Sequence, residues 1–190
     1  MRVIAGSARR LLLKTVEGLD TRPTQDRIKE TLFNMINNDV YGASFLDLFA
    51  GSGAIGIEAL SRGAKDAVFI DNGSRQVACI RENLKTTKLE EKAQVLNSDV
   101  ISGIKMLEKN GKHFDLIFMD PPYDHELEKR VMESLKDSCL IDEDSLMIIE
   151  ASLGTDFSWA APMGYEIVRT KEYKTNKHVF LMKALDADKN

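Results

Sequence analysis

Hydrophobic residues along the chain follow two alternating patterns. Short runs rich in Val, Ile, Leu and Phe have strand length, and they cover Phe45–Ala50, Ala67–Asp71, Ala93–Asn97, Asp115–Met119 and Leu146–Glu150. Unbroken apolar runs of this kind are typical of strands buried on both faces of a parallel sheet. Between the runs, apolar residues recur at helical spacing, as in the stripes Val77–Ile80–Leu84 and Leu127–Val131–Leu135. The alternation predicts an α/β fold with a doubly wound, mostly parallel sheet.

Both ends of the chain depart from this alternation. The first residues predict a β-hairpin, with arms at Arg2–Ala5 and Arg10–Lys14 around a Gly6–Ser7 turn. A helix should follow, with Thr24 as its N-cap and Ile28, Leu32, Met35 and Ile36 on its apolar face. Near the C-terminus, Tyr165–Thr170 and His178–Lys183 predict a closing antiparallel hairpin. We therefore expect an N-terminal hairpin extension over residues 1–20 and a main domain over residues 21–185.

Composition limits the class of protein. The 190 residues are 43% apolar and 29% charged, as in an ordinary soluble globular domain. No apolar run is long enough for a membrane helix or a signal peptide, so we expect a cytoplasmic protein. Cys79 and Cys139 have no metal-binding or redox spacing. The scattered histidines His113, His125 and His178 are interpreted as surface residues, and no metal site is expected.

Charge is distributed unevenly. The net charge of −4 and the pI of about 5.5 argue, taken alone, against a nucleic-acid partner. However, residues 1–14 and residues 169–183 each carry +4, so the rest of the chain carries −12. One interpretation is that the charged ends are simply solvated. The other is that the two ends meet in space and face a polyanion.

A glycine-rich loop joins a predicted strand to a predicted helix. It runs from Asp47 through Ala50-Gly51-Ser52-Gly53 to Gly56. Gly51 and Gly53 allow a tight turn that approaches a ligand closely, and Gly56 allows the helix to pack against the strand. This strand–turn–helix context favours a nucleotide-type ligand over a glycine turn without one.

Two acidic residues follow the next two strands. Asp71 comes 20 residues after Gly51, where a carboxylate can accept hydrogen bonds from both hydroxyls of a ribose. Such a device indicates a nucleoside without naming a reaction, and the alternative is a solvated Asp. Asp99, in the pair Ser98-Asp99, can bind an adenine amino group or can cap the following helix. Both roles are open to it.

The segment Asp120-Pro121-Pro122-Tyr123 follows the fourth strand and indicates the reaction. The prolines fix the backbone and remove competing donors. The Asp120 carboxylate and the Pro121 carbonyl can then accept hydrogen bonds from one exocyclic amine, and Tyr123 offers a flat face for a base to stack on. The alternative is a structural Pro-Pro turn.

Together with the glycine loop, this segment resembles the amino-methyltransferases that use S-adenosylmethionine (SAM). Three further runs extend the resemblance to the RsmD family over nearly the whole chain. They are Arg22-Pro23-Thr24-Gln25-Asp26-Arg27-Ile28-Lys29-Glu30, Glu58-Ala59-Leu60-Ser61-Arg62-Gly63-Ala64 and Arg2-Val3-Ile4-Ala5-Gly6. The fold it implies is a Rossmann-like SAM-methyltransferase sheet with a small N-terminal hairpin. The function it implies is methylation of the exocyclic N2 of one guanine in small-subunit (16S) rRNA.

The resemblance implies a role for each matched residue. Asp120, Pro121, Pro122 and Tyr123 would be catalytic. SAM, converted to S-adenosylhomocysteine, would be bound by Thr24, Arg27, Asp47, Ala50, Gly51, Ser52, Gly53, Asp71, Asn72 and Asp99. Within that set, Thr24 and Arg27 would close over the methionine carboxylate. RNA would contact Arg2, Arg9, Arg10, Arg22, Lys171 and Lys174. The partner would be 16S rRNA or the assembling small subunit, with no metal, no membrane and a monomeric protein.

Two departures from the family pattern and three alternatives remain. Asp71 stands where the family often has Glu, and Lys174 stands where its C-terminal turn usually has Gly. The same four-residue segment also serves N6-adenine DNA methyltransferases and protein-glutamine methyltransferases. A nicotinamide-dependent oxidoreductase shares the glycine loop and Asp71, but would have no use for the acceptor pair at Asp120. A non-catalytic RNA-binding or assembly factor is the third alternative.

Overall fold

The structure is a computed structural model that describes residues 1–16, 23–122 and 126–185. Seven strands form one sheet: β1 (Ser44–Leu48), β2 (Asp66–Asp71), β3 (Ala93–Asn97), β4 (Leu116–Met119), β5 (Leu146–Ser152), β6 (Tyr165–Glu172) and β7 (Asn176–Lys183). The helices are α1 (Pro23–Met35), α2 (Asn37–Val40), α3 (Ala54–Ser61), α4 (Ser74–Thr87), α5 (Val100–Lys109) and α6 (Leu127–Leu135), with a short 3-10 turn, η1 (Glu90–Lys92). The five predicted buried strands are confirmed to within two residues at each end.

The strand order explains where a ligand can enter. The order is β3-β2-β1-β4-β5-β7-β6, and every pairing is parallel except those of β7 with β5 and β6. The predicted C-terminal hairpin is thereby confirmed. The chain runs outward in one direction from β1 to β3 and in the other from β4 onward, so β1 and β4 meet at a topological switch point. Ligands in such sheets bind at the carboxyl ends of the strands beside that point.

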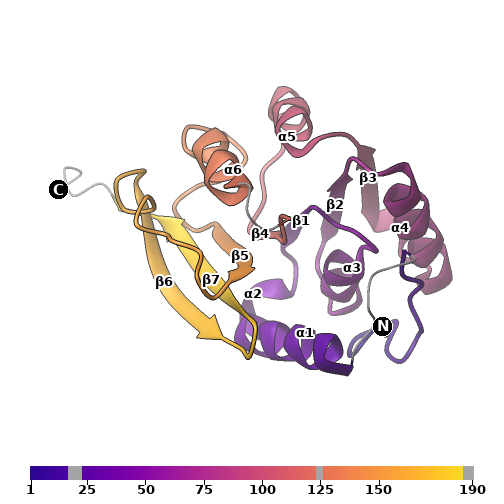
Figure 1. The fold of residues 1–190 in the computed structure, drawn as a ribbon. Coiled ribbons are helices and arrows are strands. Elements are labelled where there is room, and N and C mark those ends of the chain that lie inside the picture. The colour runs from indigo at the N-terminus through magenta and orange to yellow at the C-terminus, as the bar shows by residue number, and fades with distance from the viewer. Residues whose placement is uncertain (17–22, 123–125, 186–190) are drawn as a thin grey trace.

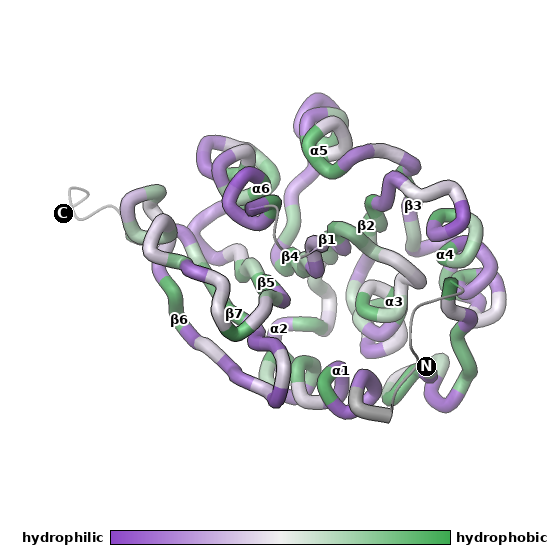
Figure 2. The backbone as a smooth tube through the Cα atoms, viewed as in Figure 1, coloured by the Kyte–Doolittle hydropathy of each residue, from purple (hydrophilic) through white to green (hydrophobic). Residues whose placement is uncertain are grey.

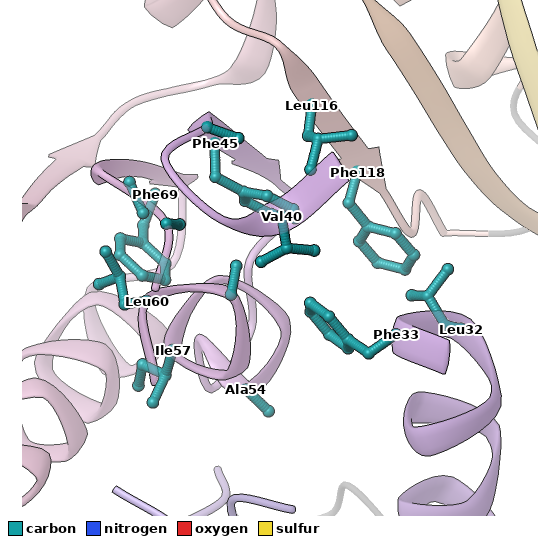
Figure 3. Packing of buried hydrophobic residues seen from close by; sticks show 14 of the residues in the cluster. Leu32, Phe33, Val40, Phe45, Ala54, Ile57, Leu60, Phe69, Leu116 and Phe118 are labelled. Carbon is teal, nitrogen blue, oxygen red and sulfur yellow. The ribbon is translucent and has the colours of Figure 1, made fainter. Parts of the chain in front are cut away.

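Helices cover both faces of the sheet and form three layers (Figure 1). On one face, α1, α3 and α4 bury apolar residues against β1, β2 and β4. In Figure 3, Leu32 and Phe33 of α1 point toward Phe118 of β4. On the other face, α5 and α6 pack against the opposite side of the same strands. The hydropathy along α4, α5 and α6 alternates between hydrophilic and hydrophobic, as expected for helices with one buried stripe (Figure 2).

The N-terminal segment differs from the predicted hairpin. Its two arms do pair antiparallel, but through a single bridge between Arg2 and Leu12. The turn between them is wider than Gly6–Ser7, because the backbone donors of the loop find partners on α3 instead of on the other arm. Val3, Ala8 and Leu13 of this segment are buried in the α1–α3 core. The domain boundary expected near residue 20 falls outside the described residues and stays a prediction.

Within the described parts of the chain, no helix has the length and apolar character needed to cross a membrane.

Candidate active site

The glycine loop leaves β1 in an unusual backbone conformation. Phe49, Gly51 and Gly53 all have positive φ angles, of 59°, 57° and 75°, which L side chains rarely adopt. Gly56 sits so close to β2 that an added Cβ would lie 2.4 Å from the Phe69 ring. Both features explain why this loop needs its glycines, as the sequence predicts.

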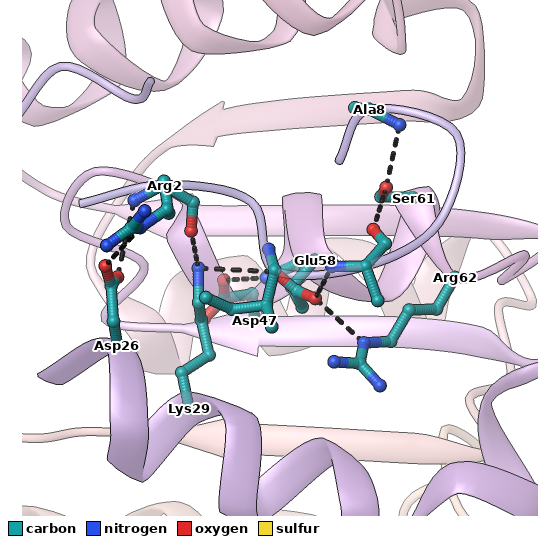
Figure 4. Close-up of polar contacts among 11 residues, drawn as sticks. Arg2, Ala8, Asp26, Lys29, Asp47, Glu58, Ser61 and Arg62 are labelled. Atoms are coloured by element: carbon teal, nitrogen blue, oxygen red, sulfur yellow. Dashed lines mark hydrogen bonds and ion pairs between the residues drawn. The ribbon is translucent and has the colours of Figure 1, made fainter. Parts of the chain in front are cut away.

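Asp47 stabilises this loop from below. Its side chain is buried, and Gly56 N donates to its Oδ2 at 2.9 Å (Figure 4). Burial raises the pKa of Asp47 well above its usual range, the Gly56 N–H opposes that rise, and the charges of Asp120 and Asp71 add to it. Asp47 therefore fixes the conformation of the loop, and its role in cofactor binding stays a prediction.

Asp71 ties β2 to the same loop. Its Oδ2 accepts from Gly51 N at 2.9 Å and its Oδ1 accepts from Gly73 N at 2.9 Å. Each carboxylate oxygen has a further lone pair, and the half-buried side chain is open on one side. A ribose with two adjacent hydroxyls can therefore be bound without disturbing the loop.

A cleft of about 570 Å³ extends from Asp71 across the carboxyl ends of the strands. We call it the outer cleft. It is lined by Phe49, Gly51, Asp71, Asn72, Gln76, Ser98, Asp99, Val100, Ile101, Asp120, Pro121, Pro122, Leu127, Arg130 and Val131. Asp99 also caps α5, since its Oδ1 accepts from Ser102 N at 3.0 Å. The capping role is thus confirmed, and its carboxylate lies in the cleft as well.

A smaller cavity of about 180 Å³ lies between α1 and the sheet. We call it the inner cavity. It is lined by Met1, Thr15, Gln25, Ile28, Lys29, Asp47, Phe49, Ala50, Gly51, Ser52, Ala54, Ile55, Phe118, Asp120, Glu150 and His178. Phe49, Gly51 and Asp120 line both spaces. A ligand in the outer cleft and a second group in the inner cavity would therefore meet at Asp120.

Asp120 is exposed where the two spaces meet. Desolvation by the surrounding protein, together with the charge of Glu150, raises the pKa of Asp120 to about 8. Among the described residues, none forms a hydrogen bond with its carboxylate, which leaves both oxygens available for a ligand. Pro121 is buried and Pro122 is exposed beside it. The predicted stacking residue Tyr123 lies outside the described residues.

The wall of the inner cavity beyond Asp120 was not predicted. The interpretation of His178 as a surface residue is wrong, because its side chain is fully buried. Its Nε2 lies 3.1 Å from Glu150 Oε2, and its ring packs edge-on against Phe118. The pairing of β5 with β7 places His178 opposite Glu150, and such a register cannot be obtained from the spacing of either segment alone.

Buried charges join the N-terminal segment to α1 and α3 (Figure 4). The fully buried Glu58 accepts from Ile4 N at 2.8 Å, Ala5 N at 3.0 Å and Arg62 Nε at 2.8 Å. Lys29 Nζ lies 3.3 Å from Glu58 Oε2 and donates to the Arg2 carbonyl oxygen at 2.6 Å. Burial lowers the pKa of Lys29, and the neighbouring Glu58 opposes that change. This network fixes one wall of the inner cavity, since Lys29 lines it.

Four arginines line a separate surface groove. Arg2, Arg9, Arg10 and Arg27 share it with Asp26 and Glu30, and Arg2 Nε forms an ion pair with Asp26 at 3.2 Å. The structure places Arg27 in this basic groove, whereas the α1 residues at the inner cavity are Gln25, Ile28 and Lys29. Arg22 and the Thr24 side chain lie outside the described residues. Lys171 and Lys174 are exposed at the end of the β6–β7 hairpin.

No group of three or more potential metal-ligating side chains occurs in the described part of the chain.

The family described as Conserved hypothetical protein 95 matches residues 1–182. The chain belongs to this family. It is the RsmD family to which the sequence motifs point. Among relatives, "Putative rRNA methyltransferase YlbH" of Bacillus subtilis is 41% identical over 150 residues, covering 79% of this chain and 82% of the relative. "Ribosomal RNA small subunit methyltransferase D" of Escherichia coli is 35% identical over 153 residues, covering 80% and 75%.

A similar solved structure confirms the fold. The structure described as "Putative methyltransferase yhhF from Escherichia coli" superposes with a TM-score of 0.83 at 30% sequence identity. The match covers 98% of this chain and 99% of that chain. The predicted Rossmann-like methyltransferase sheet is therefore confirmed over almost the whole RsmD-family chain.

Proposed function

We propose that the protein transfers a methyl group from SAM to the exocyclic N2 of a guanine in small-subunit rRNA. The observation that carries this proposal is the junction at Asp120. There the Asp120 carboxylate, which has no hydrogen-bond partner among the described residues, lines both the outer cleft and the smaller inner cavity. The relatives named as ribosomal RNA small subunit methyltransferases support the same substrate.

The outer cleft fits SAM in its chemistry. Asp71 and Asn72 would hold the ribose, and Asp99 the adenine amino group, beside the apolar side chains of Val100 and Ile101. The positive φ angles of Gly51 and Gly53 would let the backbone approach the methionine portion closely. When bound, SAM supplies a methyl group made electrophilic by a sulfonium.

The chain's own residues orient the nucleophile. A guanine in an rRNA helix must leave its stack to reach the inner cavity. Asp120 and the Pro121 carbonyl would then accept hydrogen bonds from the N2 amine and direct its lone pair toward the methyl group. Catalysis of this kind is positional and electrostatic.

The acidic wall favours guanine over the alternatives. Guanine presents the N1–H and N2 amine donors side by side, whereas adenine presents an acceptor, N1, beside its N6 amine. Asp120, with the charge of Glu150 beside it, makes this part of the inner cavity acidic, which suits the donor-rich edge. N6-adenine methylation and glutamine methylation remain the alternatives.

The basic groove would hold the RNA backbone. Arg2, Arg9, Arg10 and Arg27 line it, and guanidinium groups bind phosphates with two parallel hydrogen bonds. Lys171 and Lys174 would extend the contact from the β6–β7 hairpin. We propose 16S rRNA, free or in the assembling small subunit, as the partner.

Nucleoside mass spectrometry tests the proposal. Ribosomal RNA from a strain lacking the gene should lose one N2-methylguanine, and the purified protein with labelled SAM should restore it. Unchanged N2-methylguanine in that strain would contradict the proposed substrate. Loss of N6-methyladenine from DNA, or of a methylated glutamine, would support the corresponding alternative instead. Failure to bind labelled SAM would exclude all three methyltransferase readings.

A further inference from the structure

A row of polar side chains crosses three neighbouring strands at the inner cavity. Met119 of β4 pairs with Ile149 of β5 in parallel register, so the next residues, Asp120 and Glu150, follow side by side. Glu150 in turn pairs with His178 of β7. Because side chains alternate between the two faces of a sheet, these three extend to the same face. All three line the inner cavity.

Two side chains of β7 form hydrogen bonds with the Glu150 carboxylate. Asn176 Nδ2 donates to Oε1 at 2.5 Å, and His178 Nε2 lies 3.1 Å from Oε2. The hydroxyl of Tyr173 lies 3.2 Å from the other ring nitrogen, His178 Nδ1. If Tyr173 donates there, Nε2 carries the hydrogen that points at Glu150. Burial and the charge of Glu150 raise the pKa of Tyr173 to about 12, so the hydroxyl keeps its proton.

The orientation of Asn176 suits an ionised Glu150. The Asn176 side chain is buried, and its Oδ1 has no hydrogen-bond partner among the described residues. The opposite amide orientation would set this carbonyl oxygen against the carboxylate, which is an acceptor only when ionised. The site therefore leaves one buried oxygen unpaired so that Glu150 receives two donors.

The role of this row of side chains rests on the proposed methyl transfer and extends it. We propose that Glu150, held beside Asp120 by Asn176 and His178, is a positioning residue that prepares Asp120 to take the proton released by the methylated amine. The N2 lone pair forms a bond to the methyl carbon, and the carbon–sulfur bond breaks with its electron pair left on sulfur. The nitrogen then carries one proton too many, which passes to Asp120 and from there to solvent through the cleft.

Other charges face Asp120 from the elements around it. Asp47 of β1, Asp71 of β2, Lys29 of α1 and Arg130 of α6 line the same two spaces. Glu150 is distinguished among them by the β4–β5 register, which places it beside Asp120. Desolvation, and then the charge of Glu150, raise the pKa of Asp120. Only an ionised Asp120 can accept the proton, so methyl transfer should decline as the pH falls through the Asp120 pKa.

The pH dependence of Glu150→Gln tests the inference. We would measure kcat/KM for rRNA at saturating SAM as the pH is varied. Removing the Glu150 charge should move the acidic limb of the profile to lower pH by about one to two units. The rate on the plateau should fall, because Asp120 becomes a weaker base. The His178→Leu variant, which removes one donor from Glu150, should shift the limb in the same direction by less.

A matched control separates this effect from a change in overall charge. Glu166→Gln alters an exposed carboxylate near the start of the edge strand β6, where it pairs with Met182 and not with His178, and should leave the limb unmoved. SAM affinity and circular dichroism should match the wild type in each variant. Acidic limbs that coincide in the wild type, Glu150→Gln and His178→Leu would overturn the inference while leaving the proposed function intact. A wild-type protein without methyl transfer would contradict the proposed function itself.

Discussion

Three carboxylates at the carboxyl ends of the strands differ because their surroundings differ. Asp47 is buried and bound to the backbone of the glycine loop. Asp71 is tied by both oxygens to backbone N–H groups. Asp120 has no such partner within the described residues and is left for a ligand. Their places at strand ends can be predicted from the sequence, but these different tasks depend on which backbone donors the fold brings near.

Replacing Asp120 tests the amine-acceptor role directly. In Asp120→Ala the amine loses an acceptor at the reacting centre, and methyl transfer should fall by roughly 100-fold or more. SAM affinity, measured by calorimetry, should stay nearly unchanged, because the proposed ribose and adenine contacts are at Asp71 and Asp99. Asp115 comes just before β4, whereas Asp120 comes just after it. The control variant Asp115→Ala should therefore keep its activity. Close to full activity in Asp120→Ala would contradict the proposed role.

At the scale of elements, the central sheet was easier to predict than the N-terminal segment. Strands buried on both faces can be recognised in the sequence as unbroken apolar runs. The N-terminal loop is fixed instead by a carboxylate 54 residues away, since Ile4 N donates to Glu58. Nothing in the local pattern of residues 1–20 indicates that contact. The close approach of Gly6, where an added Cβ would lie 1.7 Å from the Ser61 carbonyl oxygen, has the same origin.

Glu58 of α3 contacts both the N-terminal segment and α1, so its replacement should strongly lower the stability of the fold. Glu58→Gln would leave Lys29 and Arg62 without their buried counter-charge, and loss of one partner of a buried pair costs about 3–5 kcal/mol. Urea unfolding should show this decrease in the free energy of unfolding. Glu82→Gln removes a carboxylate from the exposed ion pair with Lys14, and should cost no more than about 1 kcal/mol. Equal losses in the two variants would show that the buried network stabilises the fold no more than the exposed ion pair does.

At the scale of the whole molecule, the net charge of −4 is a poor guide to the partner. The fold brings basic residues from the N-terminal segment and α1 into one groove. In Figure 1 that segment and the β6–β7 hairpin lie toward the two ends of α1. The uneven charge was visible in the sequence. The recruitment of Arg27 to the groove was not, because it depends on which face of α1 the N-terminal segment covers.

Charge reversal in the groove tests whether this distribution serves RNA binding. Each phosphate contact contributes about 0.7 to 0.9 to the slope of log K against log salt. The double variant Arg9→Glu/Arg10→Glu should therefore weaken rRNA binding and reduce that slope by about 1.5. Binding measured by filter retention across a salt series gives both quantities. SAM affinity should not change, since neither arginine lines the outer cleft or the inner cavity.

The control for that experiment lies on the other face of the sheet. Lys105 and Lys109 are exposed on α5, so Lys105→Glu/Lys109→Glu changes the total charge by the same amount without touching the groove. Its salt slope should match the wild type, apart from the weak long-range effect of net charge that salt screens. If both double variants lose affinity equally, with unchanged slopes, the terminal arginines are only solvated surface charges. A loss of slope confined to Arg9→Glu/Arg10→Glu would instead place rRNA phosphates in the basic groove.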